Sequence, residues 1–182
     1  MFTVDELLAT HSSKPVPRWY KPFLRYLLCE KEFQRFGEKY PNLHGLDFIE
    51  QALRYLSFAC DVCENELEHI PPQGPVVIVA NHPIGSLDGL ALLQIISRVR
   101  GDVKIIANQL LSQIKPLNDL LLPVDNMNGN TQRQQITAIN EHLGKGGALI
   151  VFPAGEVSRL NIHGIYDSRW NNGFLRLATQ HR

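Results

Sequence analysis

A histidine and an aspartate in one short loop are the residues of this chain best suited to acid–base chemistry. His82 follows the apolar run of residues 76–80, and Asp88 lies where a helical pattern begins. A carboxylate that accepts one imidazole N–H fixes the tautomer and leaves the other ring nitrogen free as a general base. Pro83 and Gly85 allow a tight turn that brings Asp88 back toward His82. The spacing fits either this pair or a strand-capping histidine beside a favourable first-turn aspartate.

A second polar loop has the sequence FPAGEVSR at residues 152–159 and follows the apolar run of residues 148–152. In open α/β sheets, ligands bind where loops leave the carboxyl ends of the strands. Both loops follow expected strands, so both are candidate ligand-binding segments.

The elements that must position these loops follow from hydrophobic periodicity. Strands are expected at residues 76–80, 103–107, 120–124 and 148–152, and helices at residues 87–99 and 131–143. The alternation of strand and helix predicts an α/β fold with a mostly parallel sheet and flanking helices. The run at 76–80 is continuous and β-branched, which indicates a strand buried on both faces. In the helix at residues 131–143 we expect Ile136, Ile139 and Leu143 to point inward and Gly144 to form the C-terminal cap.

The first third of the chain is expected to form a helical N-terminal layer. One amphipathic segment follows Pro15 and Pro17, with aromatic residues on one face, and a second follows Gly45. Residues 14–39 carry seven basic and three acidic side chains, whereas residues 47–68 carry one basic and six acidic.

We divide the chain into this layer, at residues 1–63, and an α/β core at residues 64–182, within one structural domain. The segment at residues 19–36 suits either packing on the sheet or contact with a membrane or an acidic carrier protein.

Composition narrows the class of protein. The 182 residues carry 18 Lys and Arg against 18 Asp and Glu, which does not favour nucleic-acid binding. The start of the chain is not a secretory signal, and no apolar run is long enough for an ordinary membrane-spanning helix. Cys29, Cys60 and Cys63 are an odd number of cysteines, which indicates reduced, cytosolic thiols. We interpret Cys60 and Cys63 as packing residues because no second pair completes a metal site.

Three weaker signals have simpler interpretations. The glycines at residues 144–147 lack the order of a P-loop and fit a helix cap and strand entry. Ser86 lacks the surroundings of a hydrolase nucleophile, which leaves it as a polar residue at a helix start. The group His163, Tyr166, Asp167 and Trp170 fits loop packing better than a second catalytic set.

The two loops together resemble the motifs of the lysophospholipid acyltransferase superfamily, typified by 1-acylglycerol-3-phosphate O-acyltransferase. NHPIGSLDG at residues 81–89 and FPAGEVSR at residues 152–159 occur in the right order, and the resemblance covers residues 66–182. The pattern is most similar to a bacterial branch often labelled hemolysin or acyltransferase-like. The resemblance implies transfer of a fatty acyl group from acyl carrier protein or acyl-CoA to the hydroxyl of a lysolipid. It also implies peripheral contact with the inner face of the cell membrane, without a metal or other cofactor.

The roles of individual residues follow from the same resemblance. His82 matches the base that takes the proton from the acceptor hydroxyl, and Asp88 matches the aspartate that orients it. Backbone N–H groups of Gly85 and Ser86 are candidates for stabilising the oxyanion. In the second motif the candidate substrate contacts are Phe152, Pro153, Gly155, Glu156, Ser158 and Arg159.

The chain departs from the common motifs in three ways. Ala154 stands where Glu is usual, with Glu156 two places further on, and His82 and Asp88 are separated by five residues instead of four. Asn126 follows Asp125 where the family usually has an arginine that pairs with phosphate.

The missing arginine leaves Arg133 and Arg159 as the nearest cations. It makes an acceptor without a phosphomonoester, such as a lyso-ornithine-type lipid, as plausible as a lysophospholipid.

The sequence also allows two other functions. One is a lipid or acyl hydrolase in which His82 activates water, and the other is a lipid-binding module with an inactive site. Residues 170–182 predict an amphipathic helix that the family follows with a further strand. We therefore expect the chain to be truncated at its C-terminus relative to the family fold.

Overall fold

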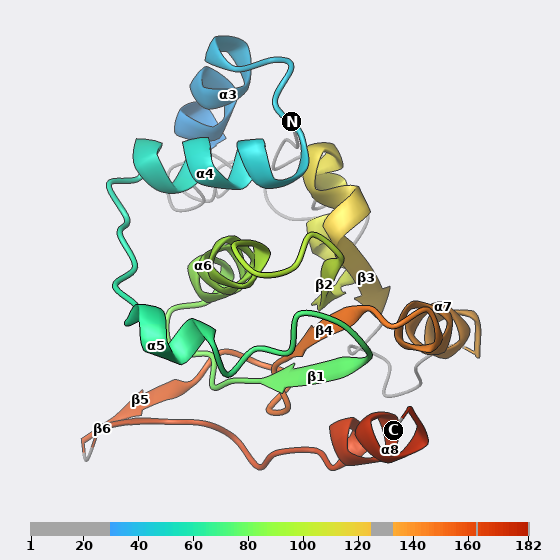
Figure 1. Ribbon diagram of the computed structural model, residues 1–182. Helices are drawn as coiled ribbons and strands as arrows, with labels where there is room; N and C mark the ends of the chain where they lie inside the picture. Colours follow the sequence, from blue (N-terminus) through green and yellow to red (C-terminus); the bar gives the residue numbers. More distant parts are fainter. Residues whose placement is uncertain (1–29, 125–132, 163, 182) are drawn as a thin grey trace.

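Four parallel strands form the central sheet in a computed structural model that describes residues 30–124, 133–162 and 164–181 (Figure 1). The strands are β1 (Val76–Val79), β2 (Val103–Asn108), β3 (Leu121–Val124) and β4 (Ala148–Val151). Their order in the sheet is β1-β4-β2-β3, so β4, the last of these four strands in the chain, lies between β1 and β2. The predicted α/β fold with a mostly parallel sheet is confirmed.

One face of the sheet is covered by helices from the first half of the chain. α6 (Ser86–Ser97) packs against β2, and α4 (Gly45–Tyr55) packs on α6, with α3 (Glu30–Lys39) beyond it (Figure 1). The N-terminal helices share their core with the sheet through fully or nearly fully buried side chains, among them Phe36, Ile49, Leu93, Ile105 and Ile150.

The opposite face is covered by α7 (Arg133–Gly144) and α8 (Gly173–Gln180). Ile139 and Leu143 are buried against Leu149 of β4, as expected. The prediction for Ile136 is wrong, because this side chain lies nearer the helix N-terminus and is 44% exposed.

The end of α7 also differs from the prediction. Gly144 belongs to the helix itself, and the residue that adopts a positive φ, of 85°, is Gly146. A Cβ at Gly147 would collide with the His142 ring. These glycines therefore allow the chain to turn tightly into β4.

The prediction that the first strand is buried on both faces is wrong. β1 is an edge strand that pairs with β4 alone among the described residues, and its side chains are half-buried or exposed. Complete burial on both faces applies instead to β4, whose residues Ala148, Leu149 and Ile150 have no exposed surface. The apolar run identified a strand but could not distinguish an edge from the centre of the sheet.

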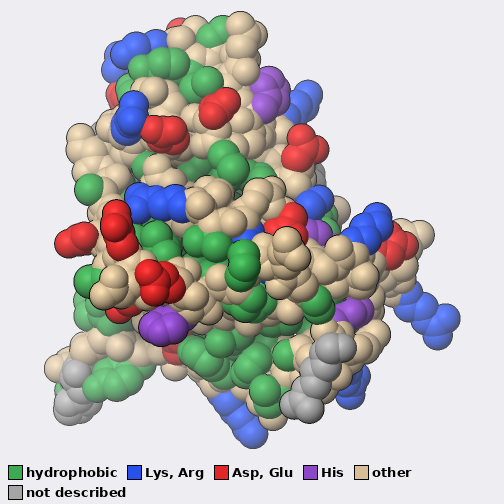
Figure 2. Space-filling view, in the orientation of Figure 1, with side chains coloured by type: hydrophobic (Ala, Val, Ile, Leu, Met, Phe, Trp, Pro, Cys, Tyr) green, Lys and Arg blue, Asp and Glu red, His purple; other side chains and the backbone are tan. Residues whose placement is uncertain are grey.

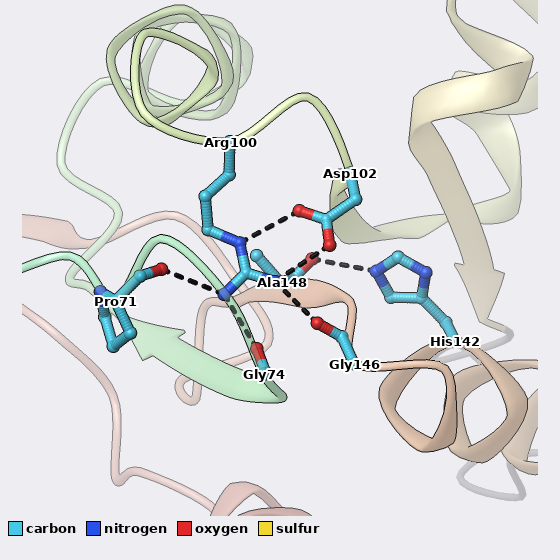
Figure 3. Close-up of polar contacts among 7 residues, drawn as sticks. All are labelled: Pro71, Gly74, Arg100, Asp102, His142, Gly146 and Ala148. Carbon is cyan, nitrogen blue, oxygen red and sulfur yellow. Dashed lines mark hydrogen bonds and ion pairs between the residues drawn. The ribbon is translucent and has the colours of Figure 1, made fainter.

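A buried arginine joins the amino ends of three strands (Figure 3). Arg100 is 3% exposed and donates hydrogen bonds to the backbone carbonyls of Pro71, Gly74 and Gly146, and it pairs with Asp102. These residues precede β1, β4 and β2, so one side chain fixes the start of each strand. The arrangement lies at the end of the sheet opposite to the loops that follow β1 and β4.

Short elements complete the described chain. They are α5 (Glu64–Leu67), the 3-10 helices η1 (Gln109–Gln113) and η2 (Lys115–Leu120), and an antiparallel hairpin of β5 (Arg159–Asn161) and β6 (Gly164–Tyr166). The hairpin, which the periodicity did not predict, extends away from the body of the molecule (Figure 1). None of the helices in the described ranges has the length and apolar character needed to span a bilayer.

Several predictions for the N-terminal part fall on residues 1–29, outside the described residues. They include the amphipathic face that begins after Pro17 and the environment of Cys29. Phe36 packs in the core against Tyr40, Phe48 and Tyr55, which favours packing over membrane contact at this position.

The two described cysteines are free thiols and lie beyond the end of α4. Cys63 is exposed, so the prediction that it packs in the interior is wrong, whereas Cys60 is partly buried.

Candidate active site

The His82 ring and the Asp88 carboxylate lie in contact at the carboxyl end of β1. His82 Nδ1 is 3.1 Å from Asp88 Oδ2, and the side chains are 17% and 12% exposed. A carboxylate oxygen only accepts hydrogen bonds, so Nδ1 carries the proton in this contact. Nε2 is then the unprotonated nitrogen, as a general base requires.

Three donors converge on one oxygen of Asp88. Besides His82, the backbone N–H groups of Ile84 and Gly85 donate to Asp88 Oδ2 at 2.8 and 3.0 Å. Asp88 is the third residue of α6, a position from which a carboxylate commonly caps the start of its own helix. The helix start therefore fixes the carboxylate, and the carboxylate in turn fixes the imidazole.

Gly85 makes this turn possible. Its φ of 95° and ψ of −137° lie in a region that residues with a Cβ rarely adopt. A Cβ there would also lie 3.6 Å from Val157 in the second loop. The turn accommodates the five residues between His82 and Asp88 and lies against the loop that follows β4.

The second loop contacts His82 in two ways. The Phe152 ring stacks on the imidazole with centroids 4.0 Å apart and planes inclined by 18°. The backbone N–H of Ser158 donates a hydrogen bond of 2.8 Å to the carbonyl oxygen of His82. The two loops predicted to bind ligand therefore form one site, which is possible because β4 lies directly beside β1.

A carboxylate from further along the chain supports this contact. Asp167 accepts hydrogen bonds from the Ser158 hydroxyl and, at 2.8 Å, from Trp170 Nε1. These two hydrogen bonds lower the pKa of the Asp167 carboxyl, and the nearby backbone of His82 lowers it further. Sequence reasoning treated Asp167 and Trp170 as loop packing, and only the short spacing of an acid and an indole hints at their pairing.

The remaining residues of the second motif form the rim and the turn. Pro153 is buried and its carbonyl accepts a hydrogen bond from the Asn171 N–H, while Gly155 has a φ of 70° and closes a turn onto Phe152. Glu156 and Arg159 pair with each other at 2.9 Å.

The Arg159 guanidinium and the Ser168 hydroxyl lower the pKa of Glu156, so this pair is charged near neutral pH. Both side chains are exposed and make no described contact with His82.

Two backbone groups were candidates for binding an oxyanion. The Gly85 N–H is engaged by Asp88, whereas the Ser86 N–H points from the first turn of α6 and has no partner among the described residues. Of the two, Ser86 retains a free donor.

Other candidate residues lie apart from this site. Arg133 begins α7, which follows β3, and β3 is separated from β4 by β2. Asp125 and Asn126 lie outside the described residues. Burial raises the pKa of the Cys60 thiol, and the charge of Arg98 partly offsets this rise. No group of three potential metal ligands gathers anywhere in the described ranges.

Comparison with known proteins supplies the family. The sequence profile of a family described as acyltransferase matches residues 6–182. The chain belongs to this acyltransferase family. This confirms the resemblance inferred from the two loops.

Two curated relatives of the acyltransferase are named lyso-glycine lipid O-acyltransferase. The protein from Phocaeicola vulgatus is 28% identical over 179 residues, which cover 96% of this chain and 63% of the relative. The protein from Bacteroides thetaiotaomicron is 28% identical over 184 residues, which cover 99% of this chain and 66% of the relative. The chain thus spans about two thirds of the length of these relatives. No solved structure matches it significantly.

Proposed function

We propose that this member of the acyltransferase family transfers a fatty acyl group from a thioester donor to the hydroxyl of a lysolipid. The observation that carries the proposal is the His82–Asp88 pair, held at 3.1 Å beside the loop that begins at Phe152. Both relatives are named for a lyso-glycine lipid acceptor, which supports a lysolipid as the acceptor here.

The geometry suits a direct transfer from donor to acceptor. His82 Nε2 removes the proton from the acceptor hydroxyl as its oxygen attacks the thioester carbonyl carbon. The tetrahedral intermediate then collapses, the C–S bond breaks, and His82 returns the proton to the departing thiolate. Asp88 stabilises the imidazolium that exists between these steps, and no acyl-enzyme intermediate is required.

The oxyanion of the tetrahedral intermediate needs a donor near His82. We assign this role to the Ser86 N–H, because the Gly85 N–H already binds Asp88. The positive end of the α6 dipole adds to the stabilisation. The acyl group comes from acylated acyl carrier protein or acyl-CoA, and both of these thioesters release a thiolate as the leaving group.

The acceptor headgroup is proposed to be an amino acid rather than a phosphomonoester. Asn126 replaces the arginine that the family uses for phosphate. Arg159 is the cation on the loop beside His82, and it can exchange Glu156 for a headgroup carboxylate. A lyso-glycine or lyso-ornithine-type lipid fits this arrangement. We propose that the reaction takes place at the inner face of the cell membrane.

A panel of acceptors tests this function. The purified chain is incubated with acyl carrier protein or CoA thioesters and with lyso-glycine lipid, lyso-ornithine lipid or lysophosphatidic acid, and the ester product is measured by mass spectrometry. We expect product with the amino-acid lipids and little with lysophosphatidic acid. Release of free fatty acid without an acceptor would identify a hydrolase instead, and lipid binding without turnover would identify an inactive binding module.

A further inference from the structure

The β5–β6 hairpin carries an unusual share of the exposed apolar surface. Seven of the eleven large hydrophobic side chains that are exposed in the described chain lie within residues 157–175, and four of these seven lie in the hairpin. The most exposed are Leu160, at 80%, and Ile162 at the hairpin tip, at 94%. Ile165 and Tyr166 on the returning strand are also more than half exposed.

Arg159, at the start of β5, is the one Asp, Glu, Lys or Arg residue in the hairpin sequence. Residues 160–166 contain no Asp, Glu, Lys or Arg, although charged side chains usually guard exposed strands. Each strand has only three residues, and an isolated two-stranded ribbon of this kind is only marginally stable in water. Exposed apolar surface of this kind typically marks an interaction site.

The charges around the hairpin indicate what covers it. Residues 156–181 contain three arginines, Arg159, Arg169 and Arg176, and two acidic residues, Glu156 and Asp167, of which Glu156 pairs with Arg159. The Asp167 carboxylate turns inward to Ser158 and Trp170, while Arg169 and Arg176 are exposed and form no ion pair with a described residue. An apolar hairpin followed in the chain by two exposed basic side chains is complementary to an anionic lipid surface.

The hairpin is connected directly to the candidate active site. Its strands leave the site after Ser158 and return at Asp167, and these two residues are hydrogen-bonded to each other. In Figure 1 the hairpin and the segment leading to α8 lie along one side of the molecule. Figure 2 shows hydrophobic side chains gathered along this side, with Lys and Arg side chains projecting from it.

We propose that the β5–β6 hairpin inserts its apolar tip into the boundary between headgroups and acyl chains of an anionic bilayer. Insertion holds the loop that carries His82 close to the membrane surface, from which the lysolipid acceptor enters the site. Only this second statement rests on the proposed function, since the membrane contact is independent of turnover.

Vesicle co-sedimentation of the 182-residue chain tests the contact without any substrate. Vesicles of phosphatidylcholine alone are compared with vesicles that also contain phosphatidylglycerol. Ile162→Glu should weaken binding to the mixed vesicles by about tenfold or more, because a charge replaces an isoleucine that enters the bilayer. Ile136→Glu is the matched control, since it makes the same change at an exposed site on α7, and it should bind as the wild type does. Arg169→Gln should weaken binding only to the anionic vesicles.

Three outcomes would overturn the proposal: no vesicle binding by the wild type, equal binding by Ile162→Glu and wild type, or a dimer in solution that Ile162→Glu dissociates. The last would assign the tip to a second copy of the chain. An activity assay distinguishes failure of the membrane contact from failure of the proposed function. Ile162→Glu should retain wild-type turnover of an acceptor dissolved in detergent and lose turnover of the same acceptor in vesicles.

Discussion

The backbone N–H of Ser158 donates a hydrogen bond of 2.8 Å to the carbonyl oxygen of His82. This bond joins the loop after β4 to the loop after β1 and depends on neither side chain. The Ser158 hydroxyl is held in turn by Asp167, and Phe152 from the same loop stacks on the imidazole. The base therefore has a fixed position relative to the loop proposed to bind the acceptor.

Asp88→Asn tests the orientation of the base. The amide can still accept from the turn, but it offers His82 no negative charge and favours the wrong tautomer. We expect kcat to fall by about 10²- to 10⁴-fold, with KM for the acceptor changed much less. Steady-state kinetics with saturating thioester donor measure both values. Wild-type kcat in this variant would exclude an orienting role for Asp88.

Asp167→Asn tests whether the second loop is held by a charged carboxylate. Misplacement of Ser158 should lower kcat by about tenfold, whereas Asp119→Asn, on the exposed surface just before β3, should leave it unchanged. Equal kcat values in the two variants would show that the charge of Asp167 is not needed to position the second loop for catalysis.

The stability that Asp167 contributes to the fold should depend on pH. The pKa of Asp167 is lowered in the fold, so its carboxylate contributes stability above the pKa of the unfolded chain. That contribution is lost as the pH falls through the folded pKa. Below about pH 4 the stability of the wild type should therefore approach that of Asp167→Asn, as measured by urea unfolding at a series of pH values.

Much of the fold could be predicted from the sequence. The short apolar runs mark the four strands, and the spacing of His82 and Asp88 identifies the central contact, because both depend on residues close together in the chain. The order of the strands does not follow from periodicity. The insertion of β4 beside β1, which brings Phe152 onto His82, is a property of the tertiary packing.

Other features could not be predicted for the same reason. The partner of Asp167 is set by the return of the hairpin, whose strands are too short and too exposed to give an alternating pattern. Whether Ile136 is buried depends on how far α7 extends over the sheet. The role of Gly146 rather than Gly144 depends on the local φ, which composition does not reveal.

Gly85→Ala tests the turn that places Asp88. A Cβ at a φ of 95° strains the backbone, and the free energy of unfolding should fall by about 1–3 kcal/mol. Gly101→Ala is the control, because a Cβ there meets no atom within 4 Å, and it should change stability by less than about 0.5 kcal/mol. Urea denaturation measures both. Equal stability of the two variants would contradict the described turn.

Arg100→Met separates stability from catalysis. The substitution leaves the carbonyls of Pro71, Gly74 and Gly146 without their donor and should destabilise the fold by about 2–4 kcal/mol. Arg98→Met, at an exposed arginine of the same segment, should lower the free energy of unfolding by less than about 0.5 kcal/mol. At a temperature where Arg100→Met is folded, its kcat should match the wild type. A catalytic defect in the folded variant would link this end of the sheet to the site.

The most direct test of the central claim is the rate of ester formation by His82→Ala with an acyl thioester and a lyso-glycine lipid. We expect a loss of about 10²- to 10⁴-fold, whereas His69→Ala, at an exposed histidine that makes no described contact with His82 or Asp88, should keep the wild-type rate. Circular dichroism confirms that both variants are folded. Ester formation by His82→Ala at the wild-type rate would contradict the assignment of His82 as the base.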